Sequence, residues 1–108
     1  MAVAGLCGTD YRIWTGDRAV VYPRVLGHEF VGHVERVGTE VTRVRPGDRV
    51  VAEPNFSCGG CALCREGNRN LCEARTAVGI DVDGGFAEMV RLPSRCCWVS
   101  SGRAGVSC

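Results

Sequence analysis

The sequence has 108 residues, enough for one domain and too few for two, so an activity that requires two lobes cannot be complete within it. All 13 basic residues are arginine, and 12 acidic residues reduce the net charge to +1. That balance argues against a basic surface that binds nucleic acid or a membrane. Because no apolar run has membrane-spanning length and the start shows no export signal, we predict a cytoplasmic protein without membrane or nucleic-acid partners.

A short helix is predicted directly after Cys7. Thr9 or Asp10 suits its N-cap, because either side-chain oxygen can accept a hydrogen bond from a free backbone N–H of the first turn. Residues 11–14 follow as the first turn or two. A helix that begins there holds Cys7 at a fixed position.

Short strands should dominate the remaining domain, because valine is frequent and stiff β-branched side chains suit strands. Three stretches have strand length, namely residues 31–37, 49–53 and 86–92. Turns rich in Gly or Pro-Gly separate them, at residues 46–48 and 83–85. The pattern predicts a mainly β fold, a small barrel or curled sheet.

Residues 55–74 differ in composition from the rest of the chain. They are rich in Cys, Gly, Asn and Arg and contain no β-branched residue, so we expect a loop lobe without an apolar core. Four of the eight cysteines lie there with the spacing C-x2-C-x2-C-x7-C, at Cys58, Cys61, Cys64 and Cys72. Because the cysteines of a protein without an export signal stay reduced, metal binding is favoured over disulfides. The spacing then predicts a closed structural zinc site.

An iron-sulfur cluster is the main alternative for this quartet, since bacterial ferredoxins also open with C-x2-C-x2-C. Their fourth cysteine follows after three residues and precedes proline, whereas Cys72 follows after seven and precedes Glu73. Four unrelated buried or disulfide-bonded cysteines are a second alternative. The spacing favours zinc over both.

A second group with metal-binding chemistry combines Cys7 with His28 and Glu29. A thiolate and an imidazole from separate elements can supply two zinc ligands, and a catalytic zinc normally takes three protein ligands and a water. Each residue alone is a weak signal, because a single cysteine or histidine is more often structural. His33 has no such context, and we assign it no role.

The run at residues 27–41 resembles the GHE-x2-G-x5-G-x2-V signature of the zinc-dependent medium-chain alcohol dehydrogenases. Other motifs follow as in that family: CGTD at 7–10, PGDRV at 46–50, the cysteine quartet and GGFAE at 84–88. Two details, EP at 53–54 before the quartet and GT at 8–9 after Cys7, look most like the sorbitol, threonine and polyol branch. The resemblance implies a GroES-like, partly open β-barrel over residues 1–95, with the zinc lobe at 55–74, as the catalytic domain of a two-domain oxidoreductase.

The resemblance also implies roles for individual residues. Cys7 and His28 would ligate a catalytic zinc, and Glu29 would lie beside the metal as a ligand or an aid to ligand exchange. Asp10 would accept a hydrogen bond from the far ring nitrogen of His28, and Thr9 would offer the first hydroxyl of a proton relay.

The activity implied by the resemblance is oxidation of a small alcohol or polyol to a carbonyl, with hydride transfer to NAD or NADP. Zinc would act as a Lewis acid that lowers the pKa of the alcohol. A structural and a catalytic zinc are the implied metals, and the resemblance is compatible with a homo-oligomer.

The sequence departs from the family pattern in three respects. Arg12 stands where relatives often carry a relay histidine, and a guanidinium cannot shuttle a proton in the same way. The later catalytic ligand and any G-x-G-x-x-G motif are absent from these 108 residues, so we expect the isolated chain to be inactive. Few residues precede Cys7, and residues 96–108 form an atypical tail, for which a truncated or frame-shifted product is our hypothesis.

Two other function classes stay open at this level. A stand-alone structural zinc-binding module would use the arginines around the quartet for protein or nucleic-acid contacts, although acidic residues lie among them and no stacking aromatic does. A non-enzymatic GroES-like chaperone subunit would explain the barrel but neither metal group. Zinc stoichiometry separates the three hypotheses.

Overall fold

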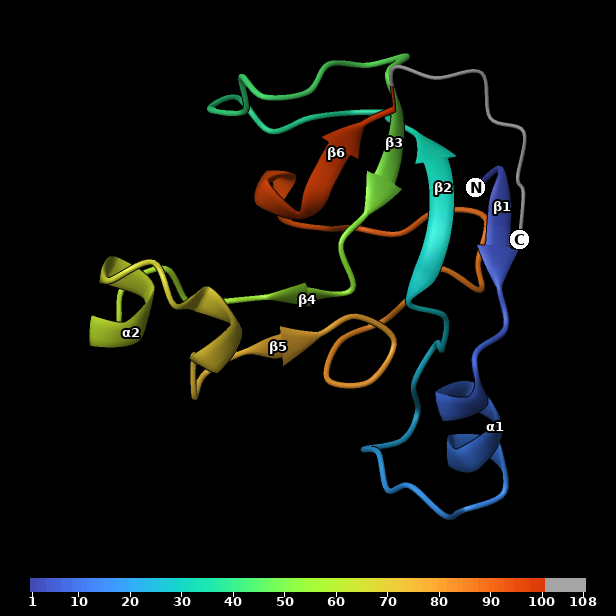
Figure 1. Ribbon diagram of the computed structural model, residues 1–108. Helices are drawn as coiled ribbons and strands as arrows, with labels where there is room; N and C mark the ends of the chain where they lie inside the picture. The colour runs from blue at the N-terminus through green and yellow to red at the C-terminus, as the bar shows by residue number, and fades with distance from the viewer. Residues whose placement is uncertain (101–108) are drawn as a thin grey trace.

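The computed structural model describes residues 1–100. Its centre is a four-stranded antiparallel sheet in the order β1-β2-β3-β6, from which a helix and a separate lobe project (Figure 1). The strands are β1 (Val3–Gly5), β2 (Glu29–His33), β3 (Arg49–Ala52) and β6 (Cys97–Val99). Within the described residues the sheet is open, which confirms the predicted mainly β, partly open architecture.

The pairing of β1 with β2 places the two segments that carry the CGTD and GHE motifs side by side. Gly5, the last residue of β1, lies opposite Glu29, the first residue of β2. Gly5 leaves room for this neighbour, because a Cβ there would come within 3.3 Å of the Glu29 carboxylate. Cys7 and His28 therefore emerge at the same end of the strand pair.

The helix α1 (Gly8–Trp14) begins earlier than predicted, with Cys7 as its N-cap. The prediction of Thr9 or Asp10 as N-cap was wrong, because Asp10 lies at the third helical position of a capping box. Its Oδ2 accepts a hydrogen bond from the backbone N–H of Cys7 at 2.9 Å. A side chain reaching back from the third position satisfies an N–H that the helix itself leaves free.

The apolar core is small and lies on one face of the sheet. Phe30, Ala52 and Val78 are buried there, and four half-buried side chains pack around them, those of Phe56, Val82, Val90 and Leu92. Phe86 packs on the turn that precedes β2, where Gly27 has a φ of +97°. A Cβ on Gly27 would lie 2.7 Å from a ring carbon of Phe86, so only glycine fits this close contact.

Residues 86–92 do not form the strand that their composition predicts. The chain is anchored just before them, since the N–H groups of Gly84, Gly85 and Phe86 donate to carbonyl oxygens of residues 25–27. The N-terminal ammonium of Met1 donates to the Glu88 carbonyl at 3.1 Å. β-propensity alone makes no strand where the segment pairs with no ladder among the described residues.

The lobe is more structured than a loop. Its base is the antiparallel pair β4 (Asn55–Phe56) and β5 (Thr76–Ala77), and it contains the helix α2 (Ala62–Arg65) and the 3-10 helix η1 (Arg69–Leu71). Within residues 55–74, all of which the structure describes, the buried side chains are Ser57, Cys64 and Cys72. The predicted absence of an apolar core in the lobe is therefore confirmed.

The first residues of the predicted tail are part of the sheet. The 3-10 helix η2 (Ser94–Cys96) leads into β6, which pairs with β3. Trp98 donates its indole N–H to Glu53 at 3.0 Å, and the guanidinium of Arg43 lies 4.2 Å from its ring centre. The remaining part of the predicted tail, residues 101–108, lies outside the described residues.

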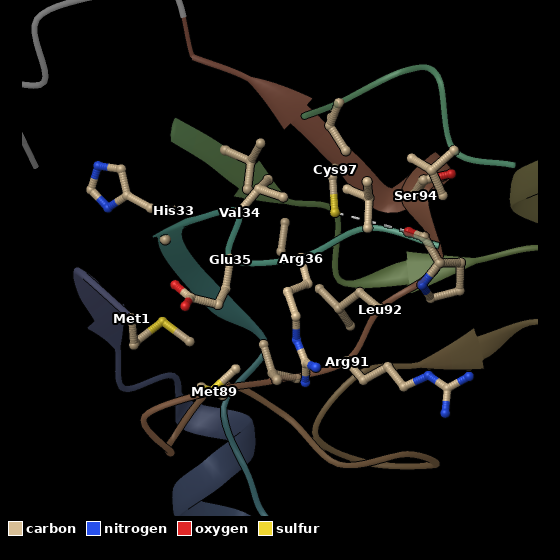
Figure 2. Close-up of a pocket in the computed structure, with 18 of the residues that line it drawn as sticks. Met1, His33, Val34, Glu35, Arg36, Met89, Arg91, Leu92, Ser94 and Cys97 are labelled. Atoms are coloured by element: carbon tan, nitrogen blue, oxygen red, sulfur yellow. Dashed lines mark hydrogen bonds between the residues drawn. The ribbon is translucent and has the colours of Figure 1, made fainter. Parts of the chain in front are cut away.

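A cavity of about 750 Å³ lies between the sheet, the 34–44 loop and residues 88–94 (Figure 2). Its lining is mainly aliphatic, and Cys97 contributes a thiol. His33 is part of this lining, and it is exposed and outside both metal-binding groups predicted from the sequence. Among residues 1–100 no helix is long and apolar enough to cross a membrane.

Candidate metal centres

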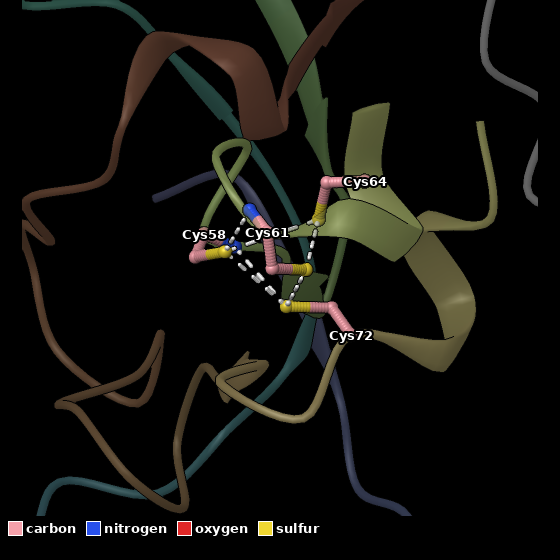
Figure 3. Close-up of side chains that lie close together, drawn as sticks. All are labelled: Cys58, Cys61, Cys64 and Cys72. Carbon is pink, nitrogen blue, oxygen red and sulfur yellow. Dashed lines mark hydrogen bonds between the residues drawn. The ribbon is translucent and has the colours of Figure 1, made fainter. Parts of the chain in front are cut away.

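The four cysteines of the lobe converge on one point (Figure 3). Their sulfur atoms all lie within 4.8 Å of one another, with separations of 3.4 Å for Cys61–Cys64, 3.6 Å for Cys58–Cys72 and 3.9 Å for Cys58–Cys64. Tetrahedral zinc with Zn–S bonds of about 2.3 Å requires S–S separations of about 3.8 Å. A disulfide would require about 2.05 Å, so the arrangement fits a tetrathiolate metal site.

Backbone N–H groups of the first turn point at the Cys58 sulfur. Those of Gly60 and Cys61 donate at 3.5 and 3.4 Å, and the Cys72 thiol adds a third contact. These hydrogen bonds, that of Gly60 first, lower the pKa of Cys58 to about 6. Thiolate is the form that binds zinc, so the turn prepares Cys58 as a ligand.

The sulfur of Cys61 has the opposite tendency. A hydrogen bond from the Cys64 backbone lowers its pKa. The neighbouring thiols and partial burial together outweigh that effect and raise the pKa of Cys61 to about 11. Sulfurs this close cannot all carry negative charge unless a cation lies among them. The donor set therefore suits Zn²⁺, which deprotonates its cysteine ligands.

The second cluster joins Cys7, His28 and Glu29, whose ligand atoms lie within 4.8 Å of one another. Cys7 comes from the junction of β1 and α1, and the other two from the start of β2. One thiolate, one imidazole and one carboxylate form a donor set that suits zinc and leaves a coordination position for water or substrate. The structure thus brings together the three residues that the sequence placed in one group.

Asp10 connects the two segments that carry this cluster. The residue is 2% exposed, and its carboxylate accepts hydrogen bonds from the backbone N–H groups of Cys7 at 2.9 Å and Gly27 at 3.4 Å. The Nδ1 atom of His28 lies 3.6 Å from Asp10 Oδ1, which is too long for a hydrogen bond. This nitrogen is buried and has no hydrogen-bond partner among the described residues. Sequence reasoning missed the backbone contacts, although the residue three positions after Cys7 is where a capping box would place an acid.

A second cavity, of about 300 Å³, is lined by His28 of this cluster and by Thr9. Arg12 is exposed and does not line it. Sequence reasoning assigned none of the other polar side chains of its wall to this site: Arg18, Asn55, Arg75 and Asp81. They come from segments far apart in the chain, so no local motif could have identified them.

The family model of the alcohol dehydrogenase GroES-like domain matches residues 1–101. The chain belongs to this family. The match extends past the boundary at residue 95 that the sequence predicted, and it agrees with the place of β6 in the sheet.

Relatives within the family are dehydrogenases. The chain is 48% identical over 99 residues to the L-threonine 3-dehydrogenase of Streptomyces avermitilis, covering 88% of this chain and 29% of the relative. It resembles the crystal structure of Escherichia coli galactitol-1-phosphate dehydrogenase with a TM-score of 0.84 and 35% identity, covering 89% and 28% of the two chains.

A second similar structure is an E. coli alcohol dehydrogenase, rspB, in complex with NADH, with a TM-score of 0.80 and 42% identity over 89% of this chain and 28% of that one. The chain therefore spans less than a third of the length of these proteins. Zinc is the metal of this family, and the quartet fits a structural zinc.

Proposed function

We propose that this chain is the metal-binding part of the catalytic domain of a zinc-dependent dehydrogenase. The enzyme oxidises a small alcohol or polyol to a carbonyl and transfers hydride to NAD or NADP. The observation that carries the proposal is the convergence of Cys7, His28 and Glu29, of which His28 also lines a cavity together with Thr9. A structural zinc module would need the quartet alone.

In this proposal Cys7 and His28 hold the catalytic zinc, and Glu29 is the third donor or assists ligand exchange. Zinc bound there supplies Lewis-acid chemistry that makes a substrate hydroxyl more acidic. Thr9 accepts the proton of that hydroxyl through its side-chain oxygen and passes it on towards solvent. Asp10 keeps the Cys7 and Gly27 backbones together, which positions the donors.

The lobe has an indirect part in the same site. Asn55 of β4 and Ala77 of β5 are paired, and both line the smaller cavity. Because the lobe has no apolar core, a metal in the quartet fixes the outer ends of these two strands. The structural zinc thereby shapes the substrate wall. The nicotinamide cofactor binds elsewhere in the longer enzyme, since residues 1–108 contain no G-x-G-x-x-G motif.

A chelator titration of the zinc-loaded chain tests the proposal. Zinc should leave in two stages, because three donors with an open position bind metal less tightly than four thiolates. Cys7→Ser and His28→Ala should abolish the weaker stage, whereas Cys61→Ser should leave it unchanged. A single stage, or a weak stage that persists in His28→Ala, contradicts the catalytic site and leaves a structural zinc module as the better description.

A further inference from the structure

The wall of the smaller cavity carries two arginines that the proposed chemistry does not use. Arg18 comes from the loop after α1, and Arg75 directly precedes β5. Both line the cavity that His28 and Thr9 also line. We propose that the substrate of this site carries an anionic group, a phosphate or a carboxylate, and that Arg18 and Arg75 bind it. The inference rests on the proposed function, whose substrate class it narrows.

The charge of the cavity supports an anion. Asp81 is the one acidic residue of its lining, and that carboxylate already accepts the Ala77 N–H at 2.8 Å. Among residues 1–100, neither Arg18 nor Arg75 forms an ion pair, whereas Arg24 and Arg45 pair with Asp83 and Asp48. The Cys7 thiolate and the Glu29 carboxylate would neutralise a divalent metal, so the excess charge comes from the wall: two guanidinium groups against one carboxylate leave one positive charge that a neutral polyol does not compensate.

Arg75 is partly fixed in place. One of its Nη atoms donates to the Asn70 carbonyl at 3.0 Å, which ties the side chain to the lobe and leaves its other N–H groups free for a ligand. A guanidinium oriented in this way matches the two oxygens of a carboxylate or phosphate. The zinc lobe thus also holds Arg75, which binds the anionic group of the substrate.

The remaining lining fits a short polar molecule. Asn55 offers an amide, and apolar surface comes from Pro54, Val78 and Ile80. A cavity of about 300 Å³ is at the small end of ligand sites, so the substrate has a short carbon chain. A hydroxyl at one end and an oxyanion at the other would use both the metal side and the arginine side of the cavity.

Binding to the 108-residue chain with zinc in the quartet and Co²⁺ in the weaker site tests the inference. The visible spectrum of Co²⁺ changes when a ligand enters next to the metal, so no turnover is needed. The probes are two matched pairs, sorbitol 6-phosphate against sorbitol and lactate against 1,2-propanediol. The anionic member of at least one pair should bind about tenfold more tightly, equal to ~1.4 kcal/mol.

Arg18→Gln and Arg75→Gln should each remove most of that preference and leave the affinity for the neutral member unchanged. Arg45→Gln is the matched control, because that arginine is highly exposed and lines neither cavity. The pair that shows the preference tells phosphate from carboxylate.

Equal affinities within both pairs would overturn the inference, as would a preference that survives in both variants, because the anion would then bind the metal itself. In either case a Co²⁺ signal that disappears in His28→Ala still supports the proposed function. Failure of Co²⁺ to bind at Cys7 and His28 would overturn both.

Discussion

The two metal clusters differ in what holds their residues together. The quartet is local: its four cysteines lie within residues 58–72, around turns and the short helices α2 and η1, with no apolar core beneath them. The Cys7, His28 and Glu29 cluster is assembled by β1–β2 pairing and by a buried carboxylate. The first site should depend on its metal for order, whereas the second should keep its shape without one.

The largest effect is expected from breaking the quartet. Cys61→Ser should remove one zinc and disorder the lobe, because metal binding to such sites supplies on the order of 10 kcal/mol. Zinc content and amide hydrogen exchange over residues 55–74 measure the result. Cys97→Ser is the control, since that thiol belongs to neither cluster. Unchanged zinc content in Cys61→Ser would contradict a structural site.

The next largest effect should come from Gly27→Ala, which disturbs the other cluster. The added Cβ meets the Phe86 ring at a residue with a φ of +97°, so we expect a loss of roughly 3 kcal/mol in unfolding free energy from strain and overpacking. Urea denaturation measures it. Gly47→Ala is a matched control, because Gly47 also has positive φ but its Cβ would meet nothing within 4 Å. Equal losses in the two variants would show that the Phe86 contact is unimportant.

Asp10→Ala should weaken the sheet-built cluster without touching the lobe. It leaves the partly buried N–H group of Cys7 and the buried N–H group of Gly27 without acceptors, which costs about 2 kcal/mol of stability. The weak stage of the chelator titration should move to lower chelator concentration, and the tight stage should not move. Asp10→Asn keeps one acceptor oxygen and should lose less. A shift of both stages would mean that the two clusters are not independent.

The smallest effect tests the contact between the two regions. Arg95 donates to the Ser57 carbonyl at 3.3 Å, and its guanidinium lies 5.2 Å from the Phe56 ring centre, which joins η2 to the base of the lobe. Arg95→Gln should cost about 1 kcal/mol and increase hydrogen exchange at β4. Arg45→Gln, at an exposed surface pair, should change stability by less than about 0.5 kcal/mol. Identical exchange in both variants would contradict this link.

Predictions from the sequence succeeded where neighbouring residues decide the outcome. Three such predictions depend on short stretches of chain: the cluster of the quartet, the lobe without an apolar core and the helix after Cys7. They failed where a distant strand partner decides the outcome. Residues 86–92 have strand composition but pair with no strand among residues 1–100, while residues 97–99, assigned to the tail, complete the sheet. Strand formation depends on a neighbour that the local sequence does not reveal.

The sequence by itself determined which residues can bind metal and, through its motifs, the family to which the chain belongs. Tertiary structure alone decided that Asp10 bonds the Cys7 and Gly27 backbones, and that Arg18 and Arg75 line the cavity that His28 also lines. The physical reason is one of range. Ligand chemistry is a property of single side chains and short spacings, whereas the wall of a cavity is made by chain segments that only strand pairing and packing bring together.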